Sequence, residues 1–212
     1  MSAAVEGAET ARPQVAGVIL AAGWGRRFGG EVSKVLRLLD GVPLVCRVAH
    51  AALAAQLAEV VVVVGHQATE VRAAVEGLPL RTVENTAWQD GQSTSVGAGL
   101  DALGDRIAAA VFLPADQPLL SPLSIDRILE AHGAGAEIVV STWGGTRRAP
   151  VLFGRRFFTE LRSLTGDTGG RALLPRYPKE VHEVPVPSAL EVADVDDPQS
   201  LRELHEALVE IL

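Results

Sequence analysis

Residues 15–34 read VAGVILAAGWGRRFGGEVSK, an apolar run followed at once by a loop of small and basic residues. The β-branched run at residues 15–20 predicts a buried strand. Small residues let backbone N–H groups approach an anion closely, and ligands of open α/β sheets bind where strands end. The loop therefore indicates a phosphate site with Arg27 and Lys34 as its cations. The simpler alternative is a solvent-facing turn with unrelated surface charges.

Two standard phosphate-binding motifs do not fit this loop. A dinucleotide fingerprint, G-x-G-x-x-G, that begins at Gly23 meets Phe28 at its third glycine, and a Walker A loop begins at neither Gly23 nor Gly25. The spacing of Arg27 and Lys34 instead suits a triphosphate under attack, where two cations neutralise charge as pyrophosphate leaves.

The rest of the chain alternates short β-branched runs with longer stretches of helical period. Strands are expected at residues 59–64, 80–83, 109–113, 137–142, 150–153, 181–184 and 190–195. Helices are expected at residues 42–57, 69–75, 94–103, 124–131 and 155–164, and from Pro198 onward. Continuous apolar strands are typical of a parallel sheet covered on both faces. We therefore predict an α/β fold, a three-layer, Rossmann-like, mostly parallel sheet with a small β-hairpin and helix elaboration.

The charge of the chain is unevenly distributed. Its 212 residues include 19 Lys and Arg and 26 Asp and Glu, a net charge of −7, which argues against nucleic-acid binding because such surfaces need excess cations. Residues 22–37 nevertheless carry a net +3, and residues 190–212 a net −6. These local charges favour a single small anion over a polyanion.

Cysteine and histidine usage and hydropathy indicate a cytoplasmic protein. The single cysteine, Cys46, excludes an intramolecular disulfide and is expected to be a small buried hydrophobe, as suits a reducing compartment. The five histidines are dispersed and make no zinc-ligand spacing. The apolar run at residues 60–64 is far shorter than the roughly 20 residues of a membrane span, and residues 1–14 lack the apolar core of a signal peptide. We expect no membrane partner.

The loop resembles the opening of glycosyltransferase-A-like nucleotidyltransferases, L-A-A-G-x-x-x-R-x-G followed by a lysine. The nucleotide and catalytic residues implied here are Leu20, Ala21, Ala22, Gly23, Gly25, Arg27, Gly29 and Lys34. Within that class the chain is most similar to MobA-like NTP transferases of the molybdenum cofactor cytidylyltransferase type. These have alanine where guanylyltransferase relatives have glycine, so Ala22 points to CTP.

The resemblance covers essentially the whole chain and implies a glycosyltransferase-A-like nucleotidyltransferase fold. It predicts a single nucleotidyltransferase domain over residues 1–212. Within it we expect a nucleotide-binding half at residues 13–142, an acceptor-side elaboration at 143–188, and a closing strand and helix at 189–212.

Asp116 lies three residues after the strand expected at residues 109–113. Pro118 then turns the chain away from the strand direction. An acid at the carboxyl end of a strand, beside a phosphate loop, can hold Mg²⁺, which prefers one or two carboxylates together with phosphate oxygens. A helix cap or turn residue is the alternative. The resembled family has G-D-Q-P-L here, with a metal-binding aspartate, and Ala115 replaces its glycine. The resemblance makes Asp116 a catalytic residue and a metal ligand.

The acidic tail carries a second predicted carboxylate. Period two along a strand places Asp194 and Asp196 on one face, and Asp197 is well placed to cap the helix at Pro198. The family's D-x-D-T-P-E-D-L matches this tail, with Asp197 where threonine is usual. It implies Asp196 as the second metal ligand and Asp194 as a flanking ligand or water-holding residue. A purely structural cap-and-surface cluster is the alternative.

Residues 84–100 join a strand to a helix through a polar loop that is expected to bind the nucleobase. Hydroxyls and free N–H groups can read the edge of a pyrimidine, and Ser93 is a plausible helix cap. The family pattern N-x-x-W-x-x-G-x-S-x-S-L-x-x-G-L is matched at Asn85, Trp88, Gly91, Ser93, Ser95 and Gly99. The resemblance implies nucleotide contacts from Asn85, Gly91, Ser93 and Ser95. Taken alone, Trp88 fits a packing anchor better than a base stacker.

Two segments of the elaboration, residues 143–153 and 166–171, resemble the family's G-G-x-x-G-H-P-V-L-F and G-D-x-G-x-R. The predicted acceptor-binding residues there are Arg147, Arg148, Asp167 and Arg171. The family's Gly-His before proline is Arg148-Ala149 here. If that histidine helps to hold the pterin, this chain takes a different acceptor.

Three functions stay open at this point. The first is Mg²⁺-dependent transfer of CMP from CTP to a phosphate-bearing acceptor, molybdopterin or molybdenum cofactor, with a molybdoenzyme or its chaperone as a further partner. The second is nucleotidyl transfer to a sugar or alcohol phosphate. The third is a non-catalytic, nucleotide-binding module that delivers cofactor, which would bind CTP without consuming it.

Overall fold

The computed structural model describes residues 13–25, 28 and 32–211. A seven-stranded sheet forms its centre, in the order β5-β4-β1-β6-β8-β7-β9. The strands are β1 (Val15–Ala21), β4 (Glu59–Val64), β5 (Arg81–Glu84), β6 (Ala109–Pro114), β7 (Ile138–Trp143), β8 (Thr146–Gly154) and β9 (Val181–Pro185). β5, β4, β1 and β6 pair in parallel, β8 is antiparallel to β6 and β7, and β9 is parallel to β7.

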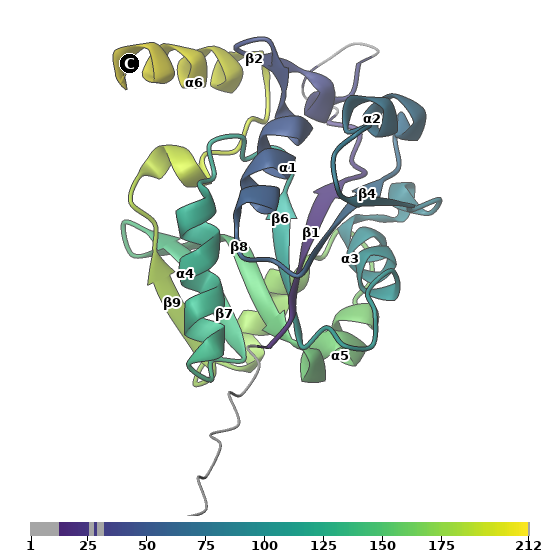
Figure 1. The fold of residues 1–212 in the computed structure, drawn as a ribbon, viewed down its shortest axis with the longest axis vertical. Helices are drawn as coiled ribbons and strands as arrows, with labels where there is room; N and C mark the ends of the chain where they lie inside the picture. Colours follow the sequence, from purple (N-terminus) through teal and green to yellow (C-terminus); the bar gives the residue numbers. More distant parts are fainter. Residues whose placement is uncertain (1–12, 26–27, 29–31, 212) are drawn as a thin grey trace, which may run out of the picture.

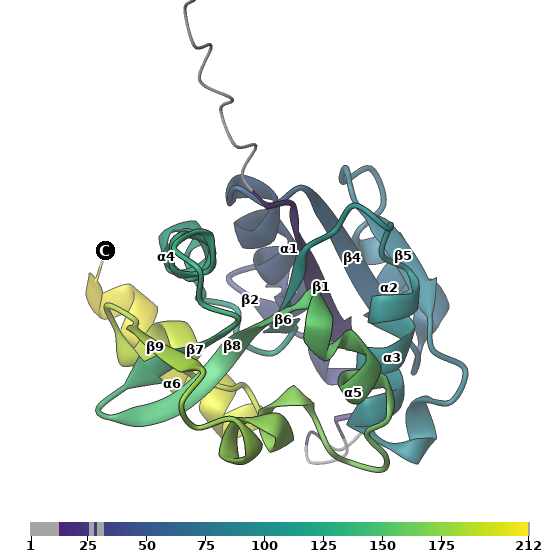
Figure 2. The same cartoon turned by 90° about the horizontal axis from the view of Figure 1, so that it is seen from below.

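Helices cover both faces of the sheet, which confirms the predicted three-layer, mostly parallel α/β fold. Figure 2 shows α1 (Leu44–Ala54) and α4 (Pro122–Gly133) on one side, and α3 (Gln92–Asp101) and α5 (Phe158–Arg162) on the other. α2 (Ala68–Ala74) packs through Val71 into the core on the α1 side. The strand β4, EVVVVV, contributes Val62 and Val64 to that core and Val63 to the core beneath α3. A strand buried on both faces has no polar alternation, as expected of a parallel sheet.

The carboxyl ends of β1 and β6 lie at the same end of the molecule. β1 and β6 are in register up to the pair Leu20 and Pro114, so the segments that follow them emerge side by side. In Figure 1 the arrow of β1 points toward the end where α6 (Pro198–Ile211) lies. Leu204 of α6 packs there with Phe28 and Leu44 in a small hydrophobic cluster. This cluster attaches the C-terminal helix to the end of the sheet where parallel α/β folds bind ligands.

The elaboration after Trp143 begins as the predicted hairpin. β7 and β8 pair across the turn at Gly144 and Gly145, with Trp143 opposite Thr146. After β8, a 3-10 turn η4 (Arg155–Phe157) leads into α5, and a second 3-10 segment, η5 (Gly170–Arg176), precedes β9. Cys46 is buried in α1, as predicted.

One predicted strand is wrong, and one predicted helix begins two residues later than expected. The strand expected at residues 190–195 is absent, because Ser188 Oγ accepts the N–H of Leu190 and starts the 3-10 helix η6 (Ala189–Val192). The helix expected from residue 42 begins at Leu44, because Val42–Pro43 (β3) pairs with Leu38–Leu39 (β2) across an Asp-Gly turn. Asp-Gly is a strong signal for a two-residue hairpin, and here it overrides the helical period of the residues that follow.

The cap predicted at Asp197 is confirmed, and α4 also has a side-chain cap. Ser121 caps α4 by accepting the Ser124 N–H, and Asp197 Oδ1 accepts the Ser200 N–H at 2.8 Å at the start of α6. Among the described residues, no helix combines the length and the apolarity that a membrane crossing requires.

Candidate active site

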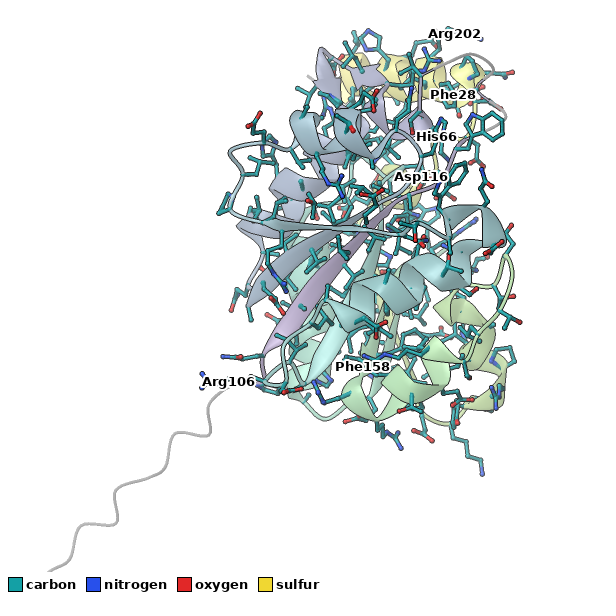
Figure 3. All side chains as sticks on the ribbon, turned by 90° about the vertical axis from the view of Figure 1, so that its right-hand side faces the viewer. Phe28, His66, Arg106, Asp116, Phe158 and Arg202 are labelled. Atoms are coloured by element: carbon teal, nitrogen blue, oxygen red, sulfur yellow. The ribbon has the colours of Figure 1, made fainter. Side chains whose placement is uncertain are left out.

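A cavity of about 720 Å³ opens at the carboxyl ends of β1 and β6. Its described lining residues are Leu20, Ala22, Gly23, Trp24, Gly25, Lys34, Val35, Trp88, Gln89, Asp90, Gly91, Gln92, Ser95, Pro114, Asp116, Asp167 and Asp196. We call it the nucleotide cavity. Figure 3 shows Asp116 and His66 at this end of the molecule and Arg106 at the other. The segment after β1, the turn after β6, the 85–95 loop and the acidic tail therefore meet in one place.

Lys34 joins two carboxylates in this cavity. Its Nζ lies 2.6 Å from Asp116 Oδ2 and 3.0 Å from Asp196 Oδ1. The three side chains come from the end of the loop after β1, the turn after β6 and the segment before α6. Only 14% of the Lys34 side chain is exposed, against 22% for Asp116 and 46% for Asp196. The structure thus brings together the two predicted metal ligands and one predicted catalytic cation.

The surroundings of Lys34 keep it charged. Burial by itself lowers the pKa of the Lys34 ammonium, but the charge of Asp116 and the hydrogen bonds to Asp116 and Asp196 outweigh burial, and the pKa is raised. A buried ammonium paired with two carboxylates is held firmly, because leaving either partner unpaired there is costly.

Gly25 provides the space for Lys34. Its φ of +66° lies in the left-handed region, where a side chain is strained. A Cβ added at Gly25 would overlap the Lys34 Cβ. The aliphatic part of the Lys34 side chain therefore packs directly on the backbone of Gly25.

Asp194 lies beside this group without joining the lysine bridge. Its Oδ1 accepts a hydrogen bond from Gln117 Nε2 at 2.9 Å. Withdrawal of the carboxyl from water and the nearby charge of Asp116 raise the pKa of Asp194. Asp194 and Asp196 do not lie on one face of a strand as predicted, because the tail is irregular here. The Val195 N–H between them donates to the Asp116 carbonyl at 2.9 Å. This backbone bond places the tail against the turn after β6.

A polar network shapes the loop at residues 85–95. The Asn85 side chain donates to Thr94 Oγ1 at 2.8 Å and to Ser95 Oγ at 2.9 Å, and it accepts from the Ala87 N–H. Asn85 is buried and is not among the described residues that line the nucleotide cavity, whereas Ser95 is. The geometry gives Asn85 the position of a residue that orients Ser95.

The predicted cap at Ser93 is wrong. Gly91 is the residue that precedes α3, and the Ser93 N–H and hydroxyl both donate to the Gly166 carbonyl, the hydroxyl at 2.8 Å. Gly91 has a φ of +109°, and a Cβ there would overlap the backbone of Gly166. This contact, which we call the Gly91–Gly166 seam, joins the start of α3 to the elaboration and satisfies the hydroxyl that the cap would have used.

A second cavity of about 300 Å³ adjoins the first. Its described lining residues are Leu20, Gln92, Val96, Phe112, Pro114, Ala149, Val151, Phe153, Asp167, Thr168, Gly169, Gly170, Arg171 and Ala172. We call it the elaboration cavity. Asp167 lines both cavities, and Arg171 lines only the second.

The other two predicted acceptor residues lie elsewhere. Arg147 pairs with Glu183 at 2.7 Å, and its carbonyl accepts a hydrogen bond from Arg171 at 3.0 Å. Neither Arg147 nor the exposed Arg148 is among the described residues that line the two cavities. Ala149, the next residue on β8, does line the elaboration cavity. The resembled family has histidine at this position.

The predicted phosphate loop is described in part. Leu20, Ala22, Gly23 and Gly25 line the nucleotide cavity, while Ala21 is fully buried under it. Arg27 and Gly29 lie outside the described residues. Their predicted roles therefore stay predictions.

An aromatic group was not expected from the sequence. The ring of His66 lies 5.5 Å from that of Trp24 and 5.2 Å from that of Trp88, and the two tryptophans are 6.5 Å apart, edge to face. Both tryptophans line the nucleotide cavity. The signal was available, because Trp24, His66 and Trp88 each follow the end of a parallel strand, and such ends share one edge of a sheet.

The carboxylates that contact Lys34 are also the groups of this cavity that could bind a divalent cation. Asp116 and Asp196 already face one positive charge, the Lys34 ammonium. Among the described residues, no group of three or more His, Cys, Asp or Glu side chains could hold a metal. Two carboxylates without further protein ligands fit Mg²⁺ or Mn²⁺ that completes its shell with phosphate oxygens and water.

Comparison with known proteins gives the family. The chain is 37% identical over 125 residues to the bifunctional protein GlmU of Bordetella parapertussis, a match that covers 58% of this chain and 27% of GlmU. A nucleotidyl transferase from Methanothermobacter thermautotroptrophicus shares the fold, with a TM-score of 0.83 at 23% identity over 94% of this chain and 99% of that one.

Rv0371C from Mycobacterium tuberculosis H37Rv, in complex with manganese, has a TM-score of 0.76 at 28% identity and covers 92% of this chain and 99% of that one. The family model of the MobA-like NTP transferase domain matches residues 17–181 and confirms the resemblance seen in the sequence. This chain therefore belongs to the MobA-like NTP transferase domain family.

Proposed function

We propose that this chain is a nucleotidyltransferase that moves CMP from CTP to a phosphate-bearing acceptor, molybdopterin or molybdenum cofactor, and releases pyrophosphate. The observation that carries the proposal is the Lys34 bridge to Asp116 and Asp196 on the wall of the nucleotide cavity. It combines a cation for the triphosphate with two carboxylates at the strand ends where α/β folds bind ligands.

In the proposed reaction an oxygen of the acceptor phosphate attacks the α-phosphorus of CTP. The bond from that phosphorus to the β-phosphate oxygen breaks, and pyrophosphate leaves with the electron pair. Such reactions depend on positioning and on charge neutralisation, so no side-chain nucleophile is required. Lys34 and Arg27 neutralise the leaving pyrophosphate in this proposal, and the backbone of residues 23–29 holds the triphosphate.

Asp116 and Asp196 are the proposed ligands of a divalent cation, which when bound supplies charge neutralisation and orients the triphosphate. The manganese complex of Rv0371C, at 28% identity, supports the use of a divalent cation. Ser95 and Gly91 line the proposed pyrimidine site, and Trp88 with Trp24 forms an aromatic wall beside it. Asn85 and Ser93 contribute by holding this loop in place rather than by contact with the cavity.

The elaboration cavity is the proposed acceptor site. It shares Leu20, Gln92, Pro114 and Asp167 with the nucleotide cavity, so an acceptor bound there would have its phosphate near the triphosphate. Arg171 is the proposed cation for that phosphate. Residues 143–188 thus form the acceptor side of a single domain, and residues 13–142 the nucleotide side. In this proposal the enzyme is cytoplasmic and supplies a molybdoenzyme or its chaperone.

Ala149 favours a second candidate function, transfer to a sugar or alcohol phosphate. It lines the elaboration cavity at the position where the resembled family carries histidine. An acceptor that depends on that histidine would lose a polar contact here, whereas a smaller alcohol phosphate would not.

Pyrophosphate release measured with CTP, GTP, ATP and UTP, each against molybdopterin, molybdenum cofactor and a set of sugar and alcohol phosphates, tests both functions. Release with CTP and molybdopterin or molybdenum cofactor supports the first function, and release only with a sugar or alcohol phosphate supports the second. Tight binding of CTP with no release for any acceptor would instead identify a non-catalytic delivery module.

A further inference from the structure

Lys34 occupies the position that the proposed function gives to a divalent cation. Its ammonium contacts one oxygen of Asp116 at 2.6 Å and one of Asp196 at 3.0 Å. These carboxylates lie 80 positions apart in the sequence, and the lysine between them is largely buried. Without a cation in this place, two carboxylates facing one point in a partly buried cavity would repel each other.

The proposed reaction gives the same lysine a different task. There it neutralises the phosphates of the nucleotide, while Asp116 and Asp196 hold the divalent cation. An ammonium at hydrogen-bond distance and a divalent cation bound to the same carboxylate oxygens would repel each other strongly in a partly buried site. The lysine and the divalent cation therefore compete for these two carboxylates.

We propose that Lys34 is the built-in counter-ion of the metal site and that its ammonium transfers from Asp116 and Asp196 to the nucleotide phosphates when the divalent cation binds. The inference rests on the proposed function, because it takes the two aspartates as the metal ligands. It makes Lys34 a positioning residue before the reaction, since it keeps the turn after β6 and the tail before α6 together.

The competition couples the binding of the divalent cation to the binding of the nucleotide. A divalent cation alone must displace the ammonium with no new partner for it, so it binds weakly. A divalent cation that arrives with a triphosphate provides phosphate oxygens for the displaced ammonium. The site is thereby selective for the metal–nucleotide complex over the free metal.

Titration of the purified protein with Mn²⁺ alone, followed by calorimetry, tests this inference without turnover. Coupling free energies between sites commonly correspond to about 5- to 150-fold in affinity. We expect Lys34→Met to bind Mn²⁺ at least about 10-fold more tightly than the unmodified protein. The chain has one other lysine, Lys179, which is exposed, and Lys179→Met should bind Mn²⁺ like the unmodified protein.

Two further variants separate the charge of Lys34 from its packing. Lys34→Gln keeps a hydrogen-bond donor without the charge and should also tighten Mn²⁺ binding, whereas Lys34→Arg keeps the charge and should not. Thermal melting of each variant identifies any that does not fold. Equal or weaker Mn²⁺ binding by both folded neutral variants would overturn the inference. The proposed function is tested separately by pyrophosphate release from the unmodified protein. If that release is observed, the proposed function stands even when the counter-ion inference is overturned.

Discussion

The two adjoining cavities differ in the charged side chains that line them. In the nucleotide cavity, Lys34, Asp116 and Asp196 converge from three separate segments and form a charged bridge. The elaboration cavity is formed largely by apolar side chains, among them Phe112, Val151 and Phe153, with Arg171 as its cation. The two cavities nevertheless share part of one wall.

In the proposed function this difference separates the transfer chemistry from the selection of the acceptor. Phosphoryl chemistry depends on charges held in fixed positions, so substitutions on the nucleotide side should reduce the rate for every acceptor. Apolar surfaces discriminate by shape and by the absence of hydrogen-bond partners, so substitutions on the elaboration side should change which acceptor is used. Three substitutions, each with a control, can break or sharpen this division.

Asp116→Asn should have the largest effect. The amide keeps the shape of the side chain but removes the charge that holds Lys34 and, in the proposed function, the divalent cation. We expect pyrophosphate release to fall by about 10²- to 10³-fold with every acceptor, as when one charge-stabilising group is removed from an active site.

Asp105→Asn is the matched control, since Asp105 is fully exposed and pairs with Arg155 away from both cavities. It should retain full activity. An Asp116→Asn enzyme that kept more than about a tenth of the original rate would show that charge does not dominate this side of the site.

Gly91→Ala should act on the seam between the two cavities. Its Cβ would overlap the Gly166 backbone, and a φ of +109° is strained for any residue with a side chain. We expect a loss of about 1–3 kcal/mol in the free energy of unfolding, measured with urea. Because Asp167 follows Gly166 and lines both cavities, KM should rise for CTP and acceptor together.

Gly97→Ala makes the same substitution inside α3, where the added Cβ overlaps nothing. Gly97 has open space where a Cβ would be added. An alanine there should be neutral or stabilise the protein by up to about 1 kcal/mol. Equal losses for the two variants would contradict the importance of the seam.

Arg171→Gln should change the acceptor alone. Arg171 lines the elaboration cavity but not the nucleotide cavity. We expect KM for the acceptor to rise about five- to tenfold, with KM for CTP unchanged, because one charge-assisted hydrogen bond at an exposed site is lost.

Arg147→Gln is the control for this prediction. Arg147 pairs with Glu183 and is not among the described residues that line either cavity, so neither KM should move by more than about twofold. A larger rise for Arg147→Gln than for Arg171→Gln would assign the acceptor phosphate to the hairpin instead.

The sequence predicted the buried strands of the sheet better than the irregular segments around them. Strand 59–64 and the approach of Asp116 to the loop after β1 follow from apolar runs and from the rule that parallel strands share a carboxyl edge. The strand expected at residues 190–195 failed because a local contact, Ser188 with the Leu190 N–H, outweighs β propensity.

The residues that sequence reasoning misplaced depend on contacts between distant segments. The local sequence predicts Ser93 as a helix cap, but its hydroxyl donates to the carbonyl of Gly166, 73 positions away. In the sequence, Arg147 and Arg171 are equally good candidates for the acceptor phosphate. The register of β8 and the path of residues 166–171 decide that only Arg171 lines the elaboration cavity. Pairing of this kind is set by tertiary structure, which no local pattern encodes.

Asp197→Ala should have the smallest effect, on the start of α6. Asp197 Oδ1 accepts the Ser200 N–H at 2.8 Å, and this backbone hydrogen bond is the main reason that its pKa is lowered from 3.8. A group whose pKa is lower in the folded state stabilises the fold above its ordinary pKa, and the contribution is lost as pH falls through the lowered value. We expect the alanine variant to melt slightly earlier than the unmodified protein at pH 7, and the difference to shrink as the pH falls below 3.8.

Asp197→Asn separates the cap from the charge. Asparagine caps helices about as well as aspartate but does not titrate in this range. It should keep most of the melting temperature at pH 7 and lose the pH dependence of the difference. If it melted as early as the alanine variant, charge rather than the cap would fix the start of α6, and with it the position of Asp196 beside Lys34.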